Sequence, residues 1–159
     1  MISASLDMLE ESLQKKIAAL TKIEEQNEKQ RDVLSNPENV DEAAFDATVD
    51  VKGKLIDEIS LIDDGFQSLF DRVKEEIGDK KELYAGQIKR MQKLIQEITS
   101  RSASIEASEH RNKRLAEKYF STAREAMNQS RSSSSAAFNY YQTMNNFKNI
   151  PPQFMDQKN

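Results

Sequence analysis

The chain has 159 residues, of which 37% are hydrophobic and 31% are charged, and its formal net charge is −4 at pH 7. This length fits one domain, and so few apolar residues argue against a thick globular core. Cysteine does not occur, which excludes disulfides, thiolate nucleophiles and zinc–thiolate sites. Glycine occurs four times and proline three times. We therefore expect an all-α fold of three long, antiparallel, coiled-coil-like helices that bury narrow apolar stripes.

The first predicted helix covers residues 5–34. Its apolar residues follow the three-and-four spacing of a helix stripe, at Leu6, Leu9, Leu13, Ile17, Leu20, Ile23 and Leu34. Asn27 and Gln30 interrupt this stripe at positions that face a partner helix. Two interpretations stay open for them. They either specify the register or let the helix fray, or they form a polar functional site.

The second predicted helix covers residues from about 38 to 77. The Asn-Pro dipeptide before it favours a turn, and either Pro37 or Asp41 can open the helix. Its stripe comprises Phe45, Val49, Leu55, Ile56, Ile59, Ile62, Phe66, Leu69, Val73 and Ile77. Lys52 falls within that stripe, and we expect its long stem to extend the ammonium group out to solvent.

The third predicted helix covers residues from about 80 to 130. Gly78 suits the left-handed position that follows a helix, and Asp79 suits the N-cap of the next one. Glu82 stands three residues after Asp79, which predicts a capping box.

Two serine-rich stretches interrupt the second half of the chain. Around residues 100–108 the apolar stripe thins, which predicts a bend or weak packing. The run Ser132–Ser135 predicts a flexible joint between a helical domain, residues 1–131, and an aromatic C-terminal tail, residues 132–159. On this view, deleting the tail from residue 136 onward leaves the helical core folded.

Charge is distributed unevenly along the chain. Residues 1–79 contain 9 basic and 20 acidic side chains, whereas residues 80–159 contain 14 and 7. We expect the acidic half to pack beside the basic half. The basic residues are interspersed with acids rather than clustered, which argues against a nucleic-acid partner.

Catalytic and cofactor motifs are missing from the sequence. His110 is the single histidine, and Lys113 follows it at the spacing of a histidine phosphotransfer domain, but Arg114 occupies the position where a glycine is needed. Glu106, Glu109 and His110 do not have the spacing of a di-iron bundle. We expect no enzyme activity, no cofactor and no metal.

Targeting and membrane signals are missing as well. The N-terminus has neither the basic nor the apolar region of a secretory signal. No apolar run approaches the roughly 18 residues that span a membrane. We expect a cytoplasmic protein without membrane insertion.

The sequence resembles the FlgN-type flagellar export chaperone family. The likeness rests on the Leu-rich helix with a Gln/Glu-rich end at 20–30, the blocks KGKLIDEISLIDDGF at 52–66 and FDRVK at 70–74, and the ending YYQTM at 140–144 through PPQF at 151–154. The C-terminal ending is the most distinctive of these, and the likeness spans nearly the whole chain.

The resemblance implies a function and its residues. Members bind hook-filament junction (hook-associated) proteins in the cytosol, shield their terminal helices and deliver them to the cytosolic domain of the export gate. Carried onto this chain, the cargo-binding residues are Leu115, Tyr119, Phe120, Ala123 and Met127. Gate binding falls to Tyr140 or Tyr141. Three alternatives remain. In the first, these residues pack within the chain's own core or in a homodimer interface. The other two are a structural coiled-coil adaptor without a secretion role and phosphotransfer at His110.

Overall fold

The computed structural model describes residues 2–126 and 138–144. Helix α1 spans Ile2–Val33, α2 spans Glu42–Ile77, the 3-10 helix η1 spans Lys80–Tyr84, and α3 spans Ala85–Ala126. Residues 138–144 are helical too, and neither described range contains a strand. The predicted all-α class is therefore confirmed.

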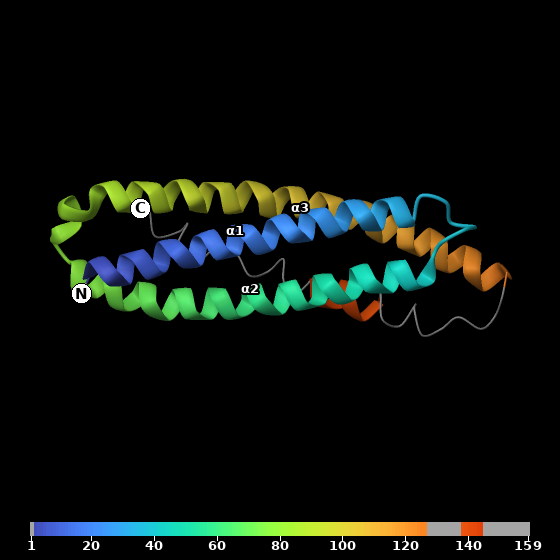
Figure 1. Ribbon diagram of the computed structural model, residues 1–159, viewed down its shortest axis with the longest axis horizontal. Coiled ribbons are helices and arrows are strands. Elements are labelled where there is room, and N and C mark those ends of the chain that lie inside the picture. The colour runs from blue at the N-terminus through green and yellow to red at the C-terminus, as the bar shows by residue number, and fades with distance from the viewer. Residues whose placement is uncertain (1, 127–137, 145–159) are drawn as a thin grey trace.

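The long helices lie side by side in an elongated bundle (Figure 1). Helix α1 packs against both α2 and α3 along its length. Lys16 bonds to Asp63, and Gln30 bonds to Thr48, so α1 and α2 run antiparallel. After the turn at η1, α3 runs back in the direction of α1 (Figure 1). Helices α2 and α3 pack mainly against α1. They also meet each other through side chains such as Lys52 and Glu109.

Helix α2 begins later than the proline predicts. Asp41 is its N-cap, with extended backbone (φ −74°, ψ 101°), and its carboxylate accepts a hydrogen bond from the Ala44 amide at 3.1 Å. Of the two predicted starts, Asp41 is the correct one. Such a cap typically contributes about 1 kcal/mol, because it satisfies an amide that has no partner within the helix.

The turn between α2 and α3 is only partly as predicted. Gly78 adopts φ 46°, a conformation that side chains with a Cβ rarely adopt. Asp79 makes no side-chain capping bond, so the predicted capping box with Glu82 is wrong. Instead the chain enters the tighter turns of η1, and α-helix resumes at Ala85.

The core is formed by the predicted apolar stripes. Leu9, Leu20, Ile23, Phe45 and Ile59 are all fully buried.

Helix α3 continues through the serine-rich stretch without interruption. Ile105 is 1% exposed, and the Ser108 hydroxyl donates to the Ile105 carbonyl at 2.9 Å. The predicted weak packing at this point is therefore wrong.

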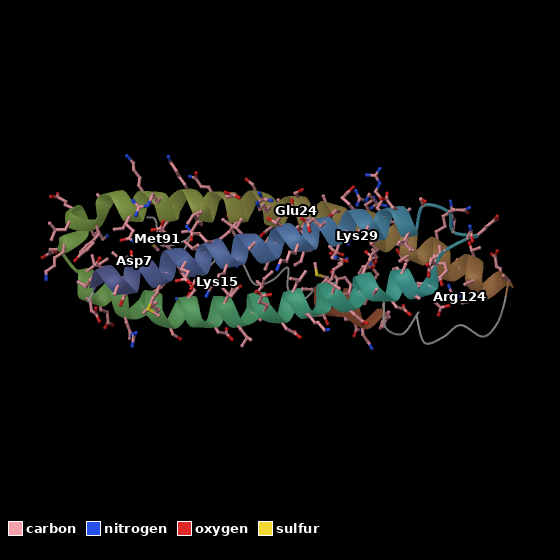
Figure 2. The ribbon with its side chains drawn as sticks, in the orientation of Figure 1. Asp7, Lys15, Glu24, Lys29, Met91 and Arg124 are labelled. Atoms are coloured by element: carbon pink, nitrogen blue, oxygen red, sulfur yellow. The ribbon has the colours of Figure 1, made fainter. Side chains whose placement is uncertain are left out.

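Ion pairs join the acidic α1 to the basic α3, as the charge distribution predicts. Figure 2 shows Glu24 at the boundary between these helices. Three such pairs form, Glu10 with Arg90, Glu24 with Arg101 and Glu28 with Arg111. Their side chains are partly exposed, and pairs of this kind each contribute well under about 1 kcal/mol.

Over the two described ranges, none of the helices combines the length and the apolar character that crossing a bilayer requires.

Candidate functional site

A buried ion pair joins α2 to α3 in the half of the bundle that contains the α1–α2 connection. The Lys52 ammonium donates to Glu109 Oε1 at 2.8 Å, and the two residues are 0% and 5% exposed. The prediction that Lys52 extends to solvent is therefore wrong. Burial lowers the pKa of Lys52 to about 8, although the neighbouring Glu109 carboxylate acts in the opposite direction.

Amides from α1 and α3 complete the surroundings of this pair. Gln30 Oε1 accepts from Lys52 at 3.0 Å and from the Asn112 amide at 3.1 Å. The Gln30 amide donates to the Thr48 hydroxyl at 3.1 Å, and Asn112 also donates to the Asn27 carbonyl at 2.9 Å. Gln30 and Asn27 therefore do not fray α1. They bond it to both other helices.

Tyr140, in the helical segment 138–144, contacts both members of the ion pair. It is 4% exposed, and its hydroxyl donates to Glu109 Oε2 at 2.8 Å. Its ring centroid lies 4.3 Å from the Lys52 nitrogen, within the range of a cation–π contact. Burial, followed by the nearby Glu109 charge, raises the pKa of Tyr140 well above its ordinary value.

These seven residues are called the polar cluster below, and they are Asn27, Gln30, Thr48, Lys52, Glu109, Asn112 and Tyr140. They come from α1, α2, α3 and the 138–144 segment. One acceptor in the cluster, Asn27 Oδ1, is buried without a hydrogen-bond partner among the described residues. Its amide nitrogen donates to the Ser108 hydroxyl at 2.7 Å.

The predicted cargo-binding residues lie in the last turns of α3. Tyr119 is buried, and its ring centroid lies 5.9 Å from that of Phe45 in an edge-on contact. Phe120 makes a similar contact with Phe45 at 6.1 Å. Leu115, Phe120 and Ala123 are only half-buried, and Met127 lies outside the described residues.

The two predicted gate-binding tyrosines differ in their surroundings. Tyr140 belongs to the polar cluster, whereas Tyr141 is half-buried and its hydroxyl has no hydrogen-bond partner among the described residues. Their ring centroids are 5.4 Å apart. Burial, followed by the Glu109 charge, raises the pKa of Tyr141. Since Tyr140 and Met144 are buried with the core, we now expect deletion of residues 136–159 to destabilise the helices.

His110 does not join the polar cluster. Its side chain is 52% exposed, and its Nε2 lies 3.8 Å from a Glu106 oxygen one helical turn away. Within the described ranges, no three histidine or acidic side chains are grouped closely enough to hold a metal ion. Glu109, which the sequence placed near His110, bonds to Lys52 instead.

Sequence reasoning missed the cluster, although one signal was present. Ile105, Glu109, Asn112, Ala116 and Tyr119 follow each other at steps of four, three, four and three. This is the spacing of one buried stripe. The stripe that seemed to thin after Ile98 is therefore continuous, with two polar members.

Comparison of the chain with protein-family models, with curated protein sequences and with solved structures gave no match.

Proposed function

We propose that the chain is a cytoplasmic export chaperone of the FlgN type, which binds a helical segment of a hook-associated protein and delivers it to the export gate. The observation that carries the proposal is that this bundle accepts an additional helix. Residues 138–144 lie against α2 and α3, and Tyr140 contacts one side chain from each of them. A surface that seats one short amphipathic helix has the chemistry to seat another.

The cargo surface in this proposal is the late face of α3. Leu115, Phe120 and Ala123 keep part of their apolar surface uncovered by the described residues. Phe120 lies three positions before Ala123 and Leu115 lies eight positions before it, so Ala123 stands between the other two on the side that a partner helix can follow. Tyr119 supports the face from beneath through its contact with Phe45. We propose that the cargo helix packs against this face of α3 as in a coiled coil.

Gate binding is proposed for the tyrosine pair. Tyr141 is the better candidate, because its ring is partly accessible and its hydroxyl makes no hydrogen bond within the described ranges. Tyr140 would first have to leave Glu109 and Lys52, at the cost of a charge-assisted hydrogen bond.

Calorimetry with purified hook-associated proteins tests the cargo surface. Ala123→Glu places a charge on this half-buried face. We expect the affinity for the hook-associated protein to fall by about thirtyfold or more, which is the usual effect of substituting a residue at the centre of an interface. Glu117→Gln, an exposed change on the same helix, serves as the matched control. Circular dichroism and melting of both variants show whether the fold is intact.

Two outcomes would contradict the proposal at different levels. If a folded Ala123→Glu variant binds cargo with wild-type affinity, the late face of α3 is not the cargo surface, but the chaperone function is not contradicted. If no hook-associated protein binds the wild-type chain, the chaperone function is wrong and the structural adaptor becomes the better explanation.

A further inference from the structure

An apolar cavity of about 240 Å³ opens between α2 and α3 at the end of the bundle near η1. Leu6 and Leu9 of α1, which are 2% and 0% exposed, form its floor. Figure 2 shows Met91 on the side of α3 that faces the other helices. The side walls are apolar as well, and they include Phe70, Val73, Met91 and Ile95. Because an apolar hollow of about 150 Å³ already admits benzene, this cavity has room for a small apolar group.

The charged residues that line this cavity are all basic. Lys74 and Lys81 line it together with Gln92, and none of the acidic residues in the described ranges does. Acidic side chains are nevertheless close in sequence, since Glu75 and Glu76 follow Lys74 directly. The cavity therefore combines apolar walls with positive charge, which suits a ligand that has an apolar part and an anionic group.

A shallower depression adjoins the cavity beside η1 and the first turns of α3. Lys81, Ile88 and Gln92 line both hollows. The depression adds Lys89, and Glu82 is the one acidic residue in the part of its lining that the structure describes. Lys81 therefore stands at the mouth of the cavity, with apolar space on one side and the protein surface on the other.

The ammonium group of Lys81 has no competing partner within residues 2–126 and 138–144. The residue is exposed, and the ion pairs of those two ranges do not include it. Behind it, the apolar wall of α3 extends from Ile88 to Ile95, a rise of seven positions. Seven positions correspond to about 10 Å of helix, which matches the length of a medium-chain alkyl group.

We propose that this cavity binds a medium-chain carboxylate, with the alkyl chain against Leu6, Leu9 and Met91 and the carboxylate beside Lys81. The volume is below the roughly 300–1,000 Å³ of pockets for drug-sized ligands, which favours a free single-chain amphiphile over a membrane lipid with two chains. The inference does not depend on the export function, because the late face of α3 lies at the opposite end of the bundle from this site (Figure 1).

Calorimetry with decanoate, kept below the concentration at which it forms micelles, tests the charged end of the site in the full-length chain. Lys81→Glu replaces attraction by repulsion, and we expect the affinity to fall by about fivefold or more. Lys80→Glu makes the same change one position earlier, at a residue that lines neither hollow, and should alter the affinity by less than about twofold. No binding to the wild type, or equal losses in both variants, would overturn the proposal.

An uncharged ligand separates the contribution of the lysines from that of the apolar walls. Decanol has the same alkyl chain without the carboxylate, so we expect it to bind at least about threefold more weakly than decanoate at low ionic strength. Added salt should reduce this difference. If the two ligands bind equally well, the positive charge does not select the ligand and the carboxylate assignment is wrong.

Filling the mouth tests the apolar end. Ile88→Trp adds bulk at a half-buried residue that lines both hollows, and we expect the affinity for decanoate to fall by about tenfold. Leu83→Trp is the matched control, because Leu83 is 76% exposed and lines neither hollow. Circular dichroism shows whether each variant folds, and Lys81→Glu decides if Ile88→Trp does not. A folded Ile88→Trp variant that binds like Leu83→Trp would show that the alkyl chain lies elsewhere.

Discussion

The two halves of the bundle are built from different chemistry. Near η1 the buried side chains of residues 2–126 are apolar except for Lys16, which pairs with the partly exposed Asp63 at 2.7 Å. Toward the α1–α2 connection, the other six buried polar residues among those described meet at Lys52 and Glu109.

The difference separates two tasks. Apolar burial is non-directional, so it stabilises any arrangement that hides the same area. A buried ion pair adds little net stability over apolar residues, but it strongly disfavours arrangements that separate the two charges. We infer that the buried apolar residues, which occur in both halves, supply most of the stability, and that the polar cluster selects the pairing of α1, α2 and α3.

The largest effect on stability is expected from breaking the ion pair between Lys52 and Glu109. Glu109→Leu leaves the Lys52 ammonium buried without its carboxylate, and we expect a loss of about 3–5 kcal/mol in the free energy of unfolding. Urea denaturation measures it. The double variant Lys52→Met with Glu109→Leu should recover most of the loss, because no charge is left buried. A double variant as unstable as the single one would show that the pair itself provides stability rather than specificity.

Next in size is the effect of the tyrosine hydroxyls. Tyr140→Phe keeps the ring over Lys52 but removes the donor to Glu109, and we expect a loss of about 1–3 kcal/mol. Tyr141→Phe is the matched control, since its buried hydroxyl has no partner among the described residues. That change should be neutral or slightly stabilising. If both variants lose the same free energy of unfolding, the hydrogen bond from Tyr140 to Glu109 does not contribute to stability.

The pH dependence of stability is smaller and has a defined sign. The pKa of Lys52 in the folded chain is about 8, below the 10.5 of an ordinary lysine, so between these values the unfolded chain binds more protons. Stability from this group therefore rises with pH, by about 1–2 kcal/mol between pH 8 and 9.5. Comparing wild type with the Lys52→Met, Glu109→Leu double variant isolates this contribution. The raised pKa of Tyr140 acts in the opposite direction only above about pH 10. A contribution that falls with pH would be inconsistent with a desolvated Lys52.

The smallest effect is expected at the surface pairs that join α1 to α3. Arg101→Gln removes partly exposed bonds to Glu24 and Glu97, and we expect a loss below about 1 kcal/mol. Added salt should reduce the difference between the variant and the wild type. A larger loss that is insensitive to salt would mean that these pairs, and not only the polar cluster, set the position of α3.

The apolar half could be predicted from sequence, whereas the polar cluster could not. The stripe from Ile59 through Val73 shows its own periodicity, so no knowledge of its partners is needed to identify it. For Lys52 the local pattern is the same whether the ammonium group is buried or solvated. The outcome depends on Glu109, which stands 57 positions later.

The helix ends show a similar contrast. Asp41 was identifiable as an N-cap because capping uses an amide three positions away. Asp79 has the same chemistry but makes no such bond, because the chain forms 3-10 turns at that point. Tyr140 carried no local sign of burial, since its partners lie on α2 and α3 and the predicted serine joint separates it from both. The cluster's position was therefore determined by tertiary contacts that single-sequence periodicity does not report.

The order in which the ribosome delivers the partners of Lys52 has a consequence for folding. Gln30 and Thr48 are 18 positions apart, so their bond can form as soon as α1 and α2 have left the ribosome. Glu109 follows Lys52 by 57 positions, a delay of about 3–11 s at 5–20 residues per second. During that interval the α1–α2 hairpin has its lysine without its carboxylate, and water must solvate the ammonium group. We therefore expect the dehydration of Lys52 to be a late event, which follows the arrival of Glu109 on α3 and of Tyr140 after it.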